Sequence, residues 1–331
     1  MKLRIATFNL ENLQDAPGKR PTLAERIEVM RPLLLRIDAD LLCLQEVGAE
    51  SGPDGARELS ALQKLVAGTP YEPFHVHHSR DAQGMAMEER NLVILSRHPF
   101  LETAQVLHDL LPAPLYRPVT ARPPVDVAQT VGWDRPVLHA SIGLPGGEVW
   151  HVINMHLKSR IPTPIDGQVR GGKFGVWQSV AGWAEGAFLS DMKRLGQALE
   201  VRTLVDRILD RDAGARIVVC GDCNALADEI SLEAIIGRIE NTDNPVLAGR
   251  ALIPCENSIP DSLRYSYLHG GRKRLLDHVF ISRGSSAFYR RAEIFNEALH
   301  DETGLSSSDE KKYPESDHAP FVVEFLLPDV A

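Results

Sequence analysis

Residues 217–224 read Ile-Val-Val-Cys-Gly-Asp-Cys-Asn, a short apolar run that stops at polar side chains. A run of this kind, bounded by turn-forming residues, is typical of a buried strand. An acidic side chain so close to a buried strand needs an explanation, because an unpaired buried charge is costly. One Asp in this position is most often a turn former or a helix cap. Asp222 by itself therefore identifies no function.

The same arrangement recurs along the chain, where five further segments place acidic, amide or imidazole groups at the end or the start of an apolar strand. These segments contain Asn9, Glu46, Asn154 with His156, Asp277 with His278, and Asp317 with His318. In a mixed sheet, the end of one strand and the start of its antiparallel neighbour share an edge. All six segments can therefore meet at one rim. Oxygen ligands without thiolates suit Mg²⁺ or Mn²⁺, and the adjacent histidines favour proton transfer and stabilisation of phosphoryl charge over a zinc site.

The order of these segments resembles a known family. In sequence they are Thr7-Phe8-Asn9-Leu10, Gln45-Glu46-Val47, Asn154-Met155-His156-Leu157-Lys158-Ser159, Gly221-Asp222-Cys223-Asn224, Leu276-Asp277-His278 and Ser316-Asp317-His318. This series resembles the endonuclease/exonuclease/phosphatase family, whose fold is shared by DNase I, exonuclease III, sphingomyelinases and inositol-phosphate 5-phosphatases. The resemblance implies an α/β fold, a four-layer sandwich of two mixed β-sheets packed face to face with helices outside. It also implies a single catalytic domain over residues 1–331.

The resemblance implies roles for the residues near the metal and the attacking water. Glu46 is expected to be the principal Mg²⁺ ligand, with Asn9 and Asp317 near the metal. Asp222 is expected to orient or deprotonate the attacking water, and Asn224 to hydrogen-bond a phosphate oxygen.

The two histidines receive roles in the same way. His318 is expected to polarise the phosphate or act as a base, with Asp277 holding its tautomer. His156 is expected to donate to a phosphate oxygen or to protonate the leaving group, with Asn154 supporting it. A histidine at position 156 resembles the DNase I and sphingomyelinase branches, because repair enzymes similar to exonuclease III have tyrosine there.

Substrate contacts are expected from the segment that follows His156. Lys158 and Arg160, together with Asn154, are predicted to bind the substrate. Residues 159–186 are rich in Gly and Pro and also contain Arg170 and Lys173, so they are predicted to form a basic substrate loop.

The remaining pattern is that of alternating strands and helices. A helix is expected from residue 22 with a kink or restart at Pro32, a second over residues 56–66, and a long amphipathic helix over residues 187–211. Residues 99–136 contain many prolines and are predicted to be extended loop rather than packed helix.

Composition and charge exclude several classes of protein. The chain has 331 residues, 44% of them hydrophobic, and a net charge of −9. These values are average for globular proteins and exclude disordered and collagen-like chains. The excess of acidic over basic residues argues against a protein that binds nucleic acid through a large basic surface, although a local basic cleft is compatible with it. The four cysteines are too few for a disulfide scaffold. With no signal peptide or membrane helix in the pattern, the expectation is a cytoplasmic protein without membrane insertion.

The leading prediction is a hydrolase of phosphoester bonds that depends on Mg²⁺ or Mn²⁺, with phosphodiester cleavage, as in a nuclease, ahead of phosphomonoester cleavage. DNA and RNA are candidate substrates, and no obligate protein partner is indicated. One alternative is a phosphatase or phospholipase acting on sugar, inositol or lipid phosphates. Another is an inactive phosphate-binding module, which would be expected to lack at least one rim residue, and none is missing.

Overall fold

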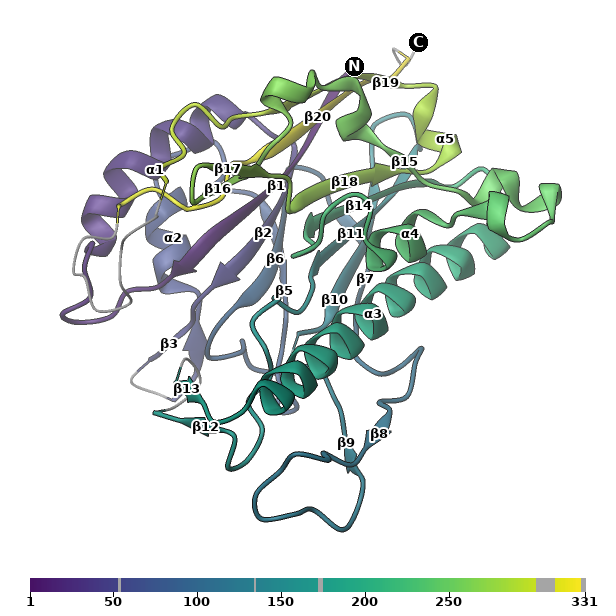
Figure 1. Cartoon of the computed structure of the whole chain (residues 1–331). Helices are drawn as coiled ribbons and strands as arrows, with labels where there is room; N and C mark the ends of the chain where they lie inside the picture. The colour runs from purple at the N-terminus through teal and green to yellow at the C-terminus, as the bar shows by residue number, and fades with distance from the viewer. Residues whose placement is uncertain (53–54, 134, 172–174, 302–312, 329–331) are drawn as a thin grey trace.

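Two six-stranded mixed sheets face each other at the centre of the molecule, with helices on their outer sides (Figure 1). The computed structural model describes residues 1–52, 55–133, 135–171, 175–301 and 313–328. The first sheet has the order β19-β20-β1-β2-β6-β5 and the second β15-β18-β14-β11-β10-β7. Within each, one central pair is parallel, β1 with β2 and β11 with β14, and the remaining pairs are antiparallel.

The elements have the following bounds. The first sheet consists of β1 (Lys2–Leu13), β2 (Leu41–Val47), β5 (His75–His78), β6 (Asn91–Ser96), β19 (Tyr289–Ile294) and β20 (Phe321–Leu326). The second consists of β7 (Phe100–Val106), β10 (Val137–Gly143), β11 (Val149–His156), β14 (Arg216–Asp222), β15 (Ile253–Pro254) and β18 (Asp277–Ile281). Short pairs are β3 (Glu50–Ser51) with β4 (Arg57–Glu58), β8 (Leu115–Tyr116) with β9 (Gln129–Thr130), β12 (Val169–Arg170) with β13 (Val176–Trp177), and β16 (Tyr267–His269) with β17 (Arg272–Arg274). The helices are α1 (Leu23–Ile37), α2 (Ser60–Val66), α3 (Val180–Arg211), α4 (Ile230–Ile236) and α5 (Arg283–Ser286).

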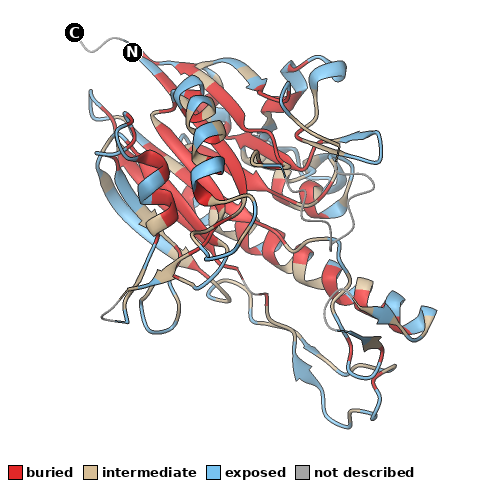
Figure 2. Cartoon of the chain, turned by 90° about the vertical axis from the view of Figure 1, so that its left-hand side faces the viewer, coloured by how far each residue is buried: buried red, intermediate tan, exposed pale blue. Residues whose placement is uncertain are grey.

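The central strands are buried on both faces, which explains their continuous apolar sequences. On β1, Leu3 and Ile5 lie in the core between the sheets, while Phe8 and Leu10 pack toward α1 and α2. Trp150 of β11 is fully buried in the core between the sheets. Figure 2 shows this burial concentrated in the strands and in the sheet-facing sides of the helices.

Helices complete the outer layers. α1 and α2 cover the first sheet, and α3 and α4 cover the second, where Val201 and Val205 of α3 pack with Val219 of β14. The expected four-layer α/β sandwich is therefore confirmed. No helix in the described part of the chain is long and apolar enough to cross a membrane.

The loop expected over residues 99–136 is in part wrong, because β7 lies within it and pairs with β10. β7 is an edge strand whose side chains are mostly exposed, so it lacks the apolar run by which a buried strand is recognised. The predicted restart at Pro32 is also absent, since α1 is a single helix from Leu23 to Ile37. α2 begins at Ser60 rather than at residue 56.

Residues 159–186 are not entirely loop, because α3 begins at Val180 rather than at residue 187. Glycines in this first part of the helix weaken the sequence pattern by which a helix is predicted. One of them, Gly186, is nevertheless required by the close packing around it. A Cβ on Gly186 would lie 2.6 Å from the carbonyl oxygen of Thr163. Arg170 is exposed in β12, and Lys173 lies outside the described residues.

Candidate active site

The end of β14 brings the predicted site residues together. Asp222 lies in register with His156 of the parallel strand β11 and with Asp277 of the antiparallel strand β18. From the other sheet, the side-chain amide of Asn9 on β1 donates to Oδ2 of Asp222 at 3.0 Å. Both sheets thus contribute to one rim.

The turn after β14 holds the Asp222 carboxylate in place. The backbone N–H of Asn224 donates to Oδ1 of Asp222 at 2.9 Å, and the Asn224 side-chain amide donates to Oδ2 at 3.2 Å and to the carbonyl of Leu157 at 3.1 Å. Gly221 has φ +145°, and a Cβ there would lie 1.9 Å from the Met155 carbonyl oxygen. Only glycine allows β14 to approach β11 this closely.

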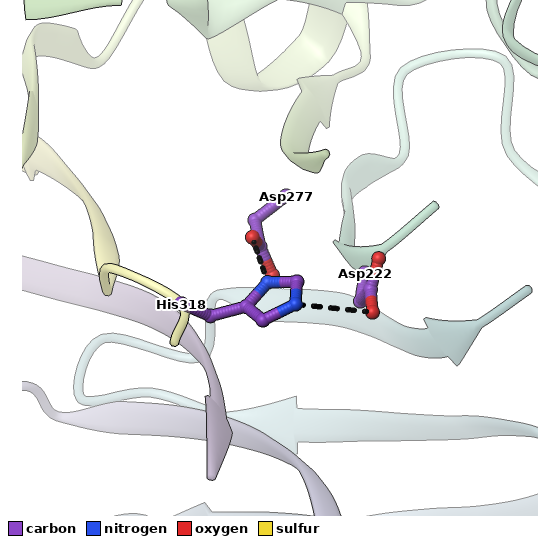
Figure 3. A group of neighbouring side chains, drawn as sticks. All are labelled: Asp222, Asp277 and His318. Carbon is purple, nitrogen blue, oxygen red and sulfur yellow. Dashed lines mark hydrogen bonds and ion pairs between the residues drawn. The ribbon is translucent and has the colours of Figure 1, made fainter. Parts of the chain in front are cut away.

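His318 lies between two carboxylates (Figure 3). Its Nδ1 is 2.6 Å from Oδ2 of Asp277 and its Nε2 is 3.9 Å from Oδ2 of Asp222. Burial alone would lower the pKa of His318, but the charges of Asp277 and Asp222 outweigh it and raise that pKa well above its usual value. The Asp277 carboxylate, on this geometry, sets the orientation of the ring.

His156 lies on the other side of Asp222 and has the opposite tendency. Its Nε2 is 3.2 Å from Oδ2 of Asp222 and 3.7 Å from Oε1 of Glu46. Burial, together with the charge of Arg135, lowers the pKa of His156 despite the nearby carboxylates. Burial would raise the pKa of Asp222, but His318 and His156 hold it below its usual range. One carboxylate therefore has a neutral imidazole on one side and a charged one on the other.

The predicted metal-binding residues face a shared cavity. Asn9, Glu46 and Asp317 all line a cavity of about 570 Å³ that also contains Asp222. Among the described His, Cys, Asp and Glu side chains, the compact group with ligand atoms within 4.8 Å of one another is Asp222, Asp277 and His318. Carboxylate and amide oxygens are the donors that Mg²⁺ and Mn²⁺ prefer. Glu46, Asp222 and Asp317 thus bring three carboxylates, with the Asn9 amide, to the wall of one cavity.

Unusual backbone conformations are concentrated at this cavity. Of the eight non-glycine residues with positive φ in the described chain, five line it. They are Glu11, Asn12, Glu46, Arg90 and Asn224. Such conformations cost about 1–3 kcal/mol each and cluster at functional sites. Glu46, with φ +60°, is also fixed by the backbone N–H of Asn12, which donates to its Oε2 at 3.1 Å.

Asn154, predicted to contact substrate, lies away from the cavity. It is fully buried, and its side-chain amide donates to the carbonyl oxygens of Leu44 at 3.0 Å and Val93 at 2.9 Å. Its Oδ1 accepts a hydrogen bond from Gln45 at 2.7 Å. Asn154 therefore ties β11 to the opposite sheet, because these polar backbone groups need a partner between the sheets. In this structure it supports the site from behind and does not reach a substrate.

Of the two basic side chains predicted to bind substrate, only one lines the cavity. The Lys158 ammonium donates to the carbonyl oxygens of Ser159 at 3.0 Å and Ile161 at 2.8 Å, and Lys158 is not part of the cavity wall. Arg160 does line the cavity, and it forms an ion pair with Glu229.

Other cavity residues were not predicted from the sequence. Arg90, Arg135 and Arg274 line the cavity, as do Tyr267 and His269. Each occurs outside the six motifs, and only the long-range packing of the chain brings them to the cavity. A single Arg outside a motif carries no pattern by which it could have been found.

A model of the endonuclease/exonuclease/phosphatase family matches residues 6–318 of the chain. The chain belongs to this family. It is an enzyme that hydrolyses phosphoester bonds, as the sequence predicted. The alternative of an inactive binding module is set aside, since every rim residue is present.

Solved structures with the same fold have low sequence identity to this chain. A mannosyl-6-phosphatase from Bacteroides thetaiotaomicron superposes with a TM-score of 0.58 at 16% identity, over 98% of this chain and 100% of that one. TDP2 from D. rerio, complexed with a single-strand DNA product, superposes with a TM-score of 0.53 at 15% sequence identity, over 98% of this chain and 99% of that one. The human Nocturnin catalytic domain with bound sulfate superposes with a TM-score of 0.56 at 16% sequence identity, over 98% of this chain and 93% of that one. A search of curated proteins found no match.

Proposed function

We propose that this enzyme is a phosphodiesterase, similar in chemistry to a nuclease, that depends on Mg²⁺ or Mn²⁺ and uses water as its nucleophile. The observation that carries the proposal is the environment of Asp222, whose Oδ2 is approached by Asn9, His156 and Asn224. A carboxylate fixed in this way can align a water for in-line attack on phosphorus.

The metal would be held by Glu46, with Asn9 and Asp317 near it. Their oxygen donors suit a hard divalent cation. The bound ion would polarise a phosphoryl oxygen and neutralise charge that develops in the transition state. Two carboxylates and an amide that line one cavity supply the oxygen donors that such a cation requires, which supports this assignment.

The remaining rim residues would act on the phosphoryl group directly. His318, charged beside Asp277, would donate to a non-bridging oxygen, and the Asn224 amide would donate to another. Asp222 would orient the attacking water and accept its proton as the water attacks phosphorus. The proton would then pass from Asp222 through His156, whose Nε2 is 3.2 Å from Asp222 Oδ2, to the leaving oxygen as its bond to phosphorus breaks.

The size and charge of the cavity favour a diester over a monoester. Its volume of about 570 Å³ exceeds what one phosphoryl group requires, and it leaves room for a substituent on each side of the phosphorus. Arg90, Arg135, Arg160 and Arg274 all line it, so basic groups are spread around the cavity although the whole chain has a net charge of −9. A phosphoester held locally, rather than along a broad basic surface, fits this distribution.

The proposal is tested by an activity screen with controlled metal content. The purified protein is assayed with Mg²⁺, with Mn²⁺ and with EDTA on bis(p-nitrophenyl) phosphate, p-nitrophenyl phosphate, single-stranded DNA, duplex DNA and RNA. We expect hydrolysis of diesters that EDTA abolishes and added metal restores. Hydrolysis of monoesters alone would contradict the proposal and favour a sugar, inositol or lipid phosphatase.

Variants connect this activity to the rim. Asp222→Asn and His318→Ala are each expected to lower kcat by about 10²-fold or more, because removal of a preorganised polar group at the reacting centre has effects of this size. Asp126→Asn changes an exposed acid outside the cavity wall and should leave kcat unchanged. Near-normal kcat in both rim variants, with metal binding intact, would refute the assigned roles.

A further inference from the structure

A small hairpin forms part of the wall of the active-site cavity. It consists of β16 and β17, with Tyr267 opposite Arg274 and His269 opposite Arg272. A bridge between Tyr267 and His318 attaches it to the rim, and the Tyr267 ring lies 5.3 Å from the imidazole of His318. The hairpin is therefore positioned by the same residue that would contact the phosphoryl group.

Three side chains of this hairpin line the cavity, namely Tyr267, His269 and Arg274. The rings of Tyr267 and His269 are stacked, with centroids 6.1 Å apart and planes 15° from parallel. They form a flat wall beside a guanidinium group. Flat rings next to a cation are suited to a substrate that has a ring and an anionic group side by side.

The guanidinium of Arg274 has no hydrogen-bonding or ionic partner within the part of the chain that the structure describes. It is half-buried and lines the cavity, where an anionic ligand would supply the partner that the described chain does not. Arg160, which also lines the cavity, is close enough for the two charges to repel. Burial first, and then the charges of Arg194 and Arg274, lower the pKa of Arg160. Two neighbouring guanidinium groups facing one cavity are an arrangement that an anion stabilises.

Arg274 and His156 approach the cavity near the ends of different strands of the second sheet. Arg274 lies just before β18, whereas His156 is at the end of β11, and β14 lies between these strands. Two strand spacings correspond to roughly 10 Å. On the first sheet, Glu46 of β2 likewise lies away from β20, the strand that follows His318. Arg274 therefore enters the cavity from the β18 side of the rim, across β14 from His156, which would contact the leaving oxygen.

We propose that Arg274, with Arg160 beside it, binds a second anionic group of the substrate, a phosphate next to the phosphoester that is cleaved. The stacked rings of Tyr267 and His269 face the sugar that joins the two phosphates, or the base that this sugar carries. This inference rests on the proposed function and specifies its substrate class. The second phosphate can belong to a nucleic acid strand or to a small molecule with two phosphates, and the two sources share this chemistry.

The test compares substrates that differ only in the second phosphate. These are a thymidine dinucleotide with one internal diester, the same dinucleotide with an added 5′- or 3′-terminal phosphate, and a ten-residue oligothymidylate. We expect the wild-type enzyme to have a higher kcat/KM for one of the phosphorylated dinucleotides than for the plain one. Arg274→Ala should reduce this ratio at least tenfold, mainly through KM, and Arg274→Lys should keep part of it because the charge remains.

Arg272→Ala is the matched control. Arg272 is exposed on the same short strand and does not line the cavity, so its removal should leave the ratio unchanged. A thermal melt of each variant establishes that the hairpin change has not unfolded the protein. Because the readout is a ratio between two substrates, a general loss of activity does not imitate the expected result.

The outcomes separate the inference from the function on which it rests. A wild-type enzyme indifferent to the terminal phosphate, or an Arg274→Ala variant with an unchanged ratio, overturns the inference. A wild-type enzyme that cleaves none of the diesters, neither bis(p-nitrophenyl) phosphate nor the dinucleotides, instead overturns the proposed phosphodiesterase. A further gain with the ten-residue strand supports a nucleic acid substrate, and no gain beyond the phosphorylated dinucleotide supports a small substrate with two phosphates.

Discussion

At the scale of single residues, the two histidines near Asp222 differ because of their surroundings. His156 is buried next to Arg135, so burial and repulsion disfavour its charged form. His318 is also buried, yet Asp277 and Asp222 favour its charged form more strongly. The sequence predicted that both would be at the rim. It could not predict opposite pKa shifts, since these depend on neighbours that come from distant parts of the chain.

Glu46 permits a test of the proposed metal site without any measurement of activity. Glu46→Gln keeps the size of the side chain but removes the negative charge that a divalent cation requires, so we expect Mn²⁺ affinity to fall at least tenfold. Titration of the substrate-free protein with Mn²⁺, followed by electron paramagnetic resonance or calorimetry, measures this. Glu58→Gln changes an exposed acid and should bind Mn²⁺ normally. Equal affinities in the two variants would show that Glu46 is not a ligand.

At the scale of elements, the site depends on how closely β11, β14 and the first sheet approach one another. Asn154 and Gln45 connect the sheets through buried hydrogen bonds, and Gly221 allows β14 to lie against the Met155 carbonyl. Both Asn154 and Gly221 belong to motifs that the sequence assigns to the rim. Its interpretation of Asn154 as a substrate contact does not fit the structure, because the direction of a side chain at a strand end depends on the partner sheet.

Gly221→Ala tests the close approach of these strands. The added Cβ would lie 1.9 Å from the Met155 carbonyl oxygen, so β14 must shift. We expect a loss of about 2–4 kcal/mol in the free energy of unfolding, together with a fall in kcat as Asp222 moves. Urea denaturation and steady-state kinetics measure the two effects. Gly249→Ala has nothing within 4 Å of its new Cβ and serves as the control. A Gly221 variant as stable as that control would be inconsistent with the tight contact.

At the scale of the whole molecule, a buried histidine pair should make stability depend on pH. His139 on β10 and His151 on β11 lie with Nε2 and Nδ1 3.0 Å apart. Burial, followed by the charges of His151 and His77, lowers the pKa of His139 to about 4. The unfolded chain binds this proton near pH 6.5, whereas the folded chain does not until about pH 4. Stability is therefore lost as the pH falls between these values.

His139→Gln removes this titration and should flatten the pH dependence. Between pH 7 and pH 5, the free energy of unfolding of the wild type should fall by about 2 kcal/mol more than that of the variant. This figure follows because each unit of pKa difference between the unfolded and folded states corresponds to about 1.4 kcal/mol. Urea denaturation at both pH values measures the difference. His75→Gln, at an exposed position on β5, should behave as the wild type. Parallel losses in the His139 variant and the wild type would contradict this account.

The sequence by itself determined the sandwich, its central strands and most of the rim. Apolar runs and the polar residues that end them are local patterns, and the order of six such motifs identifies the family. Only the tertiary structure decided the edge strand β7, the first part of α3, the inward direction of Asn154 and the cavity positions of Arg90, Arg135 and Arg274. These features depend on contacts between residues far apart in the chain. Such contacts depend on how exposed an edge strand is, on how closely two backbones approach, and on which faces of neighbouring elements meet. None of these three properties leaves a local pattern in the sequence.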